Sequence, residues 1–143
     1  MTVSYDAVAV GHEIPVRSFP VTRGQLVQYA GASGDFNTIH WNERFAKAVG
    51  LPDVIAHGMF TMATAGRLLT DWAGDPAAVV EYGVRFSSMV PVPDDETGAS
   101  IVVSGVVDAK LDDQRVSVVL TARSGGADGA KVLTQARAVV QLS

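Results

Sequence analysis

The chain has 143 residues, of which 48% are hydrophobic, a composition that predicts one compact domain over residues 1–143 with a real hydrophobic core. Its formal net charge is −4, and because no block of Lys or Arg interrupts that acidic balance, nucleic acid is a poor partner. The chain has no cysteine, which excludes disulfides, thiolate nucleophiles and Cys-based zinc sites. No apolar run reaches the ~18 residues of a membrane helix, and residues 1–11 lack a secretory pattern. We therefore expect a cytoplasmic protein without membrane insertion.

The first predicted elements are a strand and a short helix. Residues Glu13–Val21 alternate weakly and contain two prolines, which suits an edge or opening strand. Thr22 and Gln25 then form a capping-box pattern, and apolar residues at helical spacing follow until Gly31. We expect a helix that begins after Thr22 and ends at Gly31.

A loop and a second short helix come next. Residues 31–40 are rich in Gly, Ser, Asp and Asn, as loops are. Asn42 can cap a short helix that runs through Val49 and ends at Gly50. Pro52 interrupts the segment that leads to another helix start after His57.

The rest of the chain predicts one long helix followed by strands. Gly58–Trp72 is apolar on almost every side, so we expect a buried helix. Val-rich, partly alternating segments then predict four strands at Glu81–Val90, Ala99–Leu111, Arg115–Ser124 and Lys131–Leu142. Turn residues at 112–114 and 125–129 make the last three an antiparallel meander. A buried helix under an antiparallel sheet gives an α+β fold.

Two short motifs resemble a known family. Residues Ser33–His40 and Ile55–Met59 are similar to the signature of the (R)-specific enoyl hydratase, or MaoC-like, family, which has the hotdog fold of a long central helix wrapped by an antiparallel sheet. The likeness covers nearly the whole chain and is strongest to the catalytic B subunit of actinobacterial (3R)-hydroxyacyl-acyl carrier protein (ACP) dehydratases. One departure is Thr38, where the family usually has proline.

The resemblance implies a hydro-lyase that interconverts 3-hydroxyacyl and enoyl thioesters in fatty-acid or mycolic-acid metabolism. Such chemistry needs a base, an acid and an oxyanion donor. His40 is the candidate for the α-proton, because imidazoles exchange protons near neutral pH. Asp35 would handle the β-hydroxyl from within an apolar acyl channel. The Gly58 N–H, at a helix N-terminus, would stabilise the thioester oxygen.

Four further residues are site candidates. Asn37 holds the loop or the Asp35 carboxylate, and Phe36 and Trp41 flank the motif as candidate lining of an acyl tunnel. His57 contacts substrate or only packs the loop, and packing is the favoured alternative. A metal bound by the Asp and the two His residues is the less favoured alternative, because the resemblance implies chemistry without cofactor or metal.

Two other functions stay open. A hotdog thioesterase needs a carboxylate near the central helix, and residues 58–70 contain no Asp or Glu. A non-catalytic hotdog partner subunit would have little use for an acid/base pair. The expected substrate is an acyl-ACP or acyl-CoA thioester. We expect a dimer with paired sheet edges, either a homodimer or a heterodimer with a non-catalytic hotdog subunit.

Overall fold

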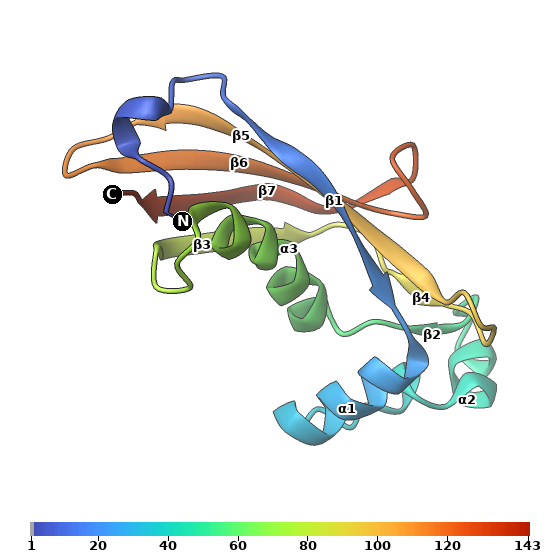
Figure 1. Cartoon of the computed structure of the whole chain (residues 1–143). Helices are drawn as coiled ribbons and strands as arrows, with labels where there is room; N and C mark the ends of the chain where they lie inside the picture. The colour runs from blue at the N-terminus through green and yellow to red at the C-terminus, as the bar shows by residue number, and fades with distance from the viewer. Residues whose placement is uncertain (1) are drawn as a thin grey trace.

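A five-stranded antiparallel sheet curves around one long helix. The computed structural model describes residues 2–143 (Figure 1). The strand order is β1 (Glu13–Val21), β5 (Ala99–Lys110), β6 (Arg115–Ser124), β7 (Ala130–Gln141) and β3 (Val79–Phe86). The helix α3 (Gly58–Ala73) lies across one face of this sheet (Figure 1). The predicted α+β class, the edge strand β1 and the antiparallel meander of the last three strands are confirmed.

The core lies between α3 and the inner face of the sheet. Alternate residues of β5 and β6 are buried, as a strand with one covered face requires. Leu68 and Leu69 of α3 are fully buried in this core, whereas Met59 is 57% exposed. The predicted buried helix is therefore present but is buried along one face only, because the sheet covers one side of α3. Among residues 2–143, no helix has both the length and the apolarity that a bilayer crossing requires.

A glycine in the middle of α3 allows β3 to approach the helix closely. The ring of Tyr82 lies so near Gly66 that a Cβ there would sit 3.0 Å from the ring. The Tyr82 hydroxyl donates to the carbonyl oxygen of Met62 at 2.8 Å, and burial raises the pKa of Tyr82 to about 12. This contact fixes the edge strand β3 onto the helix.

The helices that carry the candidate site lie beyond the N-terminal end of α3 (Figure 1). The small elements of the chain are η1 (Tyr5–Ala7), α1 (Arg23–Ser33), η2 (Thr38–His40), α2 (Glu43–Ala48), β2 (Val54–Ile55) and β4 (Pro91–Val92). The capping box at the start of α1 is present, with both Thr22 and Gln25 side chains bonded to backbone N–H groups. Asn42 caps α2 as predicted.

Three sequence-based boundaries are corrected. Helix α1 passes Gly31 and ends at Ser33, because Gly34 adopts the left-handed conformation (φ 77°) that closes a helix. Strand β3 begins and ends earlier than Glu81–Val90. The residues after it turn away to form β4, which pairs with β2 in a separate two-stranded sheet that the sequence did not predict.

Candidate active site

The loop between α1 and α2 is folded by its own polar side chains. The Asp35 N–H donates to Ser33 Oγ at 3.1 Å, and the Asn37 N–H donates to Asp35 Oδ1 at 3.1 Å. Asn37 Oδ1 accepts from the Ile39 N–H at 3.3 Å and so caps η2. Asn37 therefore shapes the turn that presents His40.

The tautomer of His40 is set by a backbone carbonyl. His40 Nδ1 lies 2.6 Å from the carbonyl oxygen of Ile55, and because a carbonyl can only accept, Nδ1 carries the hydrogen when the ring is neutral. Nε2 is then the unprotonated nitrogen, and it lies 4.0 Å from Asp35 Oδ2. The His40 ring is buried, while the Asp35 side chain is 52% exposed. The expected burial of Asp35 in an apolar channel is therefore absent in this chain.

His57 supports both members of this pair. Its ring stacks on His40 with centroids 3.7 Å apart, and its Nε2 donates to the backbone carbonyl of Asp35 at 3.1 Å. The Tyr29 ring packs in an edge-to-face arrangement with the His57 ring, and the two ring centroids lie 4.8 Å apart. Burial lowers the pKa of His57, so the ring is uncharged near neutral pH. Within residues 2–143, its buried Nδ1 has no hydrogen-bond partner. These contacts favour the packing role over direct substrate binding.

Two cavities meet at the start of α3. One of about 360 Å³ is bordered by His40, and one of about 450 Å³ is bordered by Asp35 and His57. Gly58 and Phe86 border both. Gly58 is the first residue of α3, where N–H groups have no intrahelical acceptor, and the side chain before it does not cap the helix. The Gly58 N–H, at the start of this helix, can therefore bind an oxyanion beside either cavity.

Two predicted tunnel residues lie elsewhere. Phe36 and Trp41 are about half exposed or more, and neither is among the residues that border these two cavities. The Trp41 Nε1–H donates to the Phe36 carbonyl at 3.1 Å, which ties the two ends of the loop together. Sequence reasoning missed Tyr29 and Phe86 as site residues. Both are aromatic residues within regular elements, where spacing alone indicates packing.

The three candidate metal ligands are close together but poorly directed. One atom each from Asp35, His40 and His57 lie within 4.8 Å of one another. Imidazole lone pairs lie in the ring plane, and the two rings are stacked at 24°, so their free nitrogens do not converge on one point. The geometry suits proton transfer better than metal binding.

Comparison with known proteins gives concordant matches. Residues 8–124 match the family described as "MaoC like domain". The chain is 43% identical over 79 residues to 3-hydroxyacyl-thioester dehydratase X of Mycobacterium tuberculosis, covering 55% of this chain and 27% of that protein. It is 31% identical over 91 residues to the (R)-specific enoyl-CoA hydratase of Rhodospirillum rubrum, covering 63% of this chain and 62% of that one.

A solved structure confirms the hotdog fold. A protein described as a MaoC-like dehydratase superposes with a TM-score of 0.92 at 43% identity, covering 99% of this chain and 43% of the other. The chain thus spans less than two thirds of the length of each of these relatives.

Proposed function

We propose, from the premise that this chain belongs to the MaoC-like domain family, that it is a (3R)-hydroxyacyl thioester dehydratase or (R)-specific enoyl hydratase. The names of the two relatives, a 3-hydroxyacyl-thioester dehydratase and an (R)-specific enoyl-CoA hydratase, support this activity. We further propose that the acyl group arrives as a thioester of CoA or of acyl carrier protein.

The observation that carries the proposal is the pairing of His40 Nε2 with Asp35 Oδ2. The Ile55 carbonyl holds the imidazole with Nε2 free, and that atom lies 4.0 Å from the carboxylate oxygen. This separation lets His40 Nε2 and Asp35 Oδ2 reach adjacent carbons of one substrate. Two proton-transfer groups of different chemistry, beside a helix N-terminus, match the demands of a hydro-lyase.

The two groups divide the chemistry between the α and β carbons. In hydration, the Asp35 carboxylate takes a proton from water as the water oxygen bonds to C3, and the His40 imidazolium gives a proton to C2. In dehydration, neutral His40 removes the C2 proton while protonated Asp35 gives its proton to the leaving hydroxyl. Water is the only molecule gained or lost. The exposed position of Asp35 gives water access to the carboxylate.

Gly58 supplies the third group. Removing or adding the C2 proton develops negative charge on the thioester oxygen. The N–H of Gly58 and the positive end of the α3 dipole can stabilise that charge. No side chain at residue 58 stands between the amide and the substrate.

We propose a dimer as the active assembly. The sheet ends in the edge strand β3, and α3 carries the exposed residues Met59, Ala63 and Arg67. Pairing with an identical or a related hotdog chain would cover both. Light scattering with and without a co-expressed second chain distinguishes the homodimer from the heterodimer.

Hydration of trans-2-enoyl thioesters in deuterium oxide tests the proposal. We expect the (3R)-hydroxy product because of the likeness to an (R)-specific enoyl-CoA hydratase. We expect syn addition because His40 Nε2 and Asp35 Oδ2 lie close enough to act from the same side of the substrate. CoA and carrier-protein thioesters of several chain lengths are compared, with and without the co-expressed chain. A (3S) product or anti addition would contradict the assignment. Release of free thiol without hydration would indicate a thioesterase, and absence of both reactions would indicate a non-catalytic subunit.

A further inference from the structure

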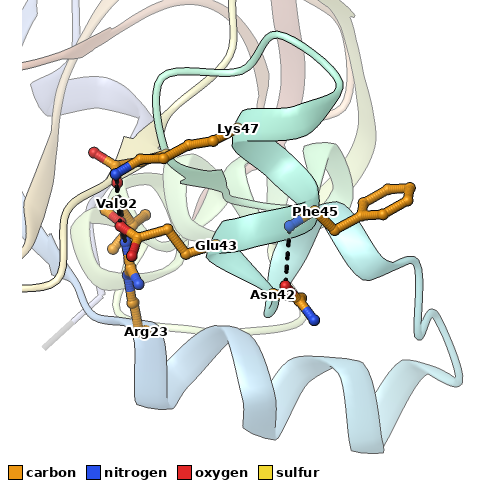
Figure 2. A network of polar contacts seen from close by, with 7 residues as sticks. Arg23, Asn42, Glu43, Phe45, Lys47 and Val92 are labelled. Atoms are coloured by element: carbon orange, nitrogen blue, oxygen red, sulfur yellow. Dashed lines mark hydrogen bonds and ion pairs between the residues drawn. The ribbon is translucent and has the colours of Figure 1, made fainter.

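Arg23 is the centre of a polar network beside the candidate active site. Its Nε donates to the carbonyl oxygen of Val92 at 2.9 Å, and its Nη2 donates to Glu43 at 3.1 Å and to Asp53 at 3.0 Å. Lys47 adds a bond to Glu43 at 3.0 Å. Figure 2 shows the Arg23 side chain reaching from the start of α1 toward β4 and α2. The side chains of Arg23 and Asp53 are each 23% exposed, whereas those of Glu43 and Lys47 are 37% and 54% exposed, so the Arg23–Asp53 pair is the more sheltered part of the network.

The partners of Arg23 belong to the segments that hold the reacting groups. Arg23 begins α1, which ends two residues before Asp35. Glu43 begins α2, three residues after His40. Asp53 immediately precedes β2, whose Ile55 carbonyl sets the His40 tautomer. The Arg23 guanidinium thus links the segment before Asp35, the segment after His40, and the strand β2 that orients the His40 ring.

Arginine suits this place for a chemical reason. A guanidinium offers five N–H donors in a rigid plane, and here it serves two carboxylates and one carbonyl at once. The ammonium of a lysine is a point donor and cannot reproduce this fork. Hydrogen bonds from Lys47, and next from Arg23, hold the pKa of Glu43 at about 2, so this carboxylate stays ionised throughout the pH range of the reaction.

We propose that Arg23 is a positioning residue that fixes the separation of Asp35 and His40 and the hydrogen bond from His40 to Ile55. This inference rests on the proposed function. Arg23 borders neither cavity at the site, so it acts through the segments it joins. A misplacement of about 1 Å between reacting groups can cost about 100-fold in rate, which is why such a network matters for catalysis.

The first test is imidazole nitrogen NMR on the 15N-labelled full chain at pH 8. We expect wild-type His40 as the Nδ1–H tautomer, and a shift toward a mixture of tautomers in Arg23→Gln. His12, which lies outside the site, serves as the internal reference. The matched control is Arg17→Gln, which removes the ion pair to Asp71 between β1 and α3 and should leave His40 unchanged.

The second test is steady-state hydration of an enoyl thioester. For Arg23→Gln we expect kcat to fall by about 10- to 100-fold while KM stays within about threefold. Arg23→Lys, which keeps the charge and loses the fork, should fall between wild type and Arg23→Gln, and it replaces Arg23→Gln if that variant does not fold. Wild-type tautomer and kcat in the Arg23 variants, or equal losses in Arg17→Gln, would overturn the proposal.

The two tests separate the two hypotheses. The NMR measurement needs no substrate, so it reports on positioning even if the thioester is not hydrated. A wild-type chain with the expected tautomer and no hydratase activity would refute the proposed function. Hydratase activity in the wild type, together with a His40 tautomer that does not change in the Arg23 variants, would refute only the positioning role of Arg23.

Discussion

Alanine at residue 58 would place one methyl group where the two cavities meet. A Cβ built on Gly58 lies 3.2, 3.3 and 3.4 Å from three carbons of the Phe86 ring. These contacts are a few tenths of an ångström too close. The Phe86 ring is 50% exposed, so it can move by that amount. The substitution therefore tests the space at the amide rather than the packing of the core.

The fold should tolerate Gly58→Ala. Gly58 is not among the residues with positive φ, so alanine can adopt its backbone conformation, and alanine is the better helix former. The small displacement of Phe86 offsets part of that gain. We expect the unfolding free energy of the variant to stay within about 1 kcal/mol of wild type.

We expect Gly58→Ala to lower the hydration rate strongly. The methyl group borders both cavities and keeps the thioester oxygen from the residue 58 N–H. Loss of one oxyanion donor typically lowers turnover by about 100- to 1,000-fold, so we expect kcat/KM to fall by at least ~100-fold.

Hydration rates and urea unfolding are measured for Gly58→Ala beside a matched glycine control. Gly31→Ala, on α1, would place its Cβ with no atom within 4 Å apart from neighbouring residues and the backbone of its own helix, and we expect wild-type rates there. The double variant Gly58→Ala with Phe86→Ala removes the ring and should remain slow. Wild-type turnover in Gly58→Ala, or recovery in the double variant, would refute the reasoning.

Three further predictions address the acid/base pair, His57 and metals. Asp35→Asn and His40→Ala should each lower turnover by at least ~100-fold with unchanged circular dichroism, while His12→Ala should not. Burial lowers the pKa of His57 in the folded chain. The His57 contribution to the free energy of unfolding is therefore fully present above the ordinary pKa of 6.5, where the ring is neutral in both states. It decreases as pH falls toward the folded-state pKa, because the unfolded chain takes up the proton first. Urea titrations from pH 8 to 4 should show this slope, and His57→Gln should reduce it; an unchanged slope would refute it. Dialysis against a strong chelator should leave the hydration rate unchanged, and a loss restored by zinc would favour a metal site.

Sequence patterns located most elements because their ends carry specific chemistry. The capping box at Thr22 and the Asn42 cap bond their own neighbours, so the start of each helix is a local property. The end of α1 was misplaced because two glycines compete for it. Gly31 stays helical, and only Gly34 takes the left-handed conformation. Which glycine ends the helix depends on the path of the loop that follows, and the local sequence does not determine that path.

The same distinction applies to the candidate site. Asp35 and His40 share one short loop, so their proximity follows from the chain itself. The stacking of His57 on His40 and the Phe86 ring beside Gly58 are contacts between distant segments. Sequence reasoning named His57 only through its helix-start motif and gave Phe86 no role. Tertiary contacts of this kind need the sheet and α3 to be placed first.

The choice of the reacting nitrogen on His40 depends on a part of the fold that has almost no sequence signal. That choice is made by the Ile55 carbonyl, which lies in β2, and β2 is held by two paired residues of β4 and by the bond from the Ala56 N–H to the Val90 carbonyl at 2.9 Å. Strands of two residues are too short to show any periodicity. Arg23 binds the carbonyl of Val92 in the same β4. The orientation of the base is therefore a property of this small sheet and of the network that anchors it, and substitutions there can alter the chemistry without touching a reacting atom.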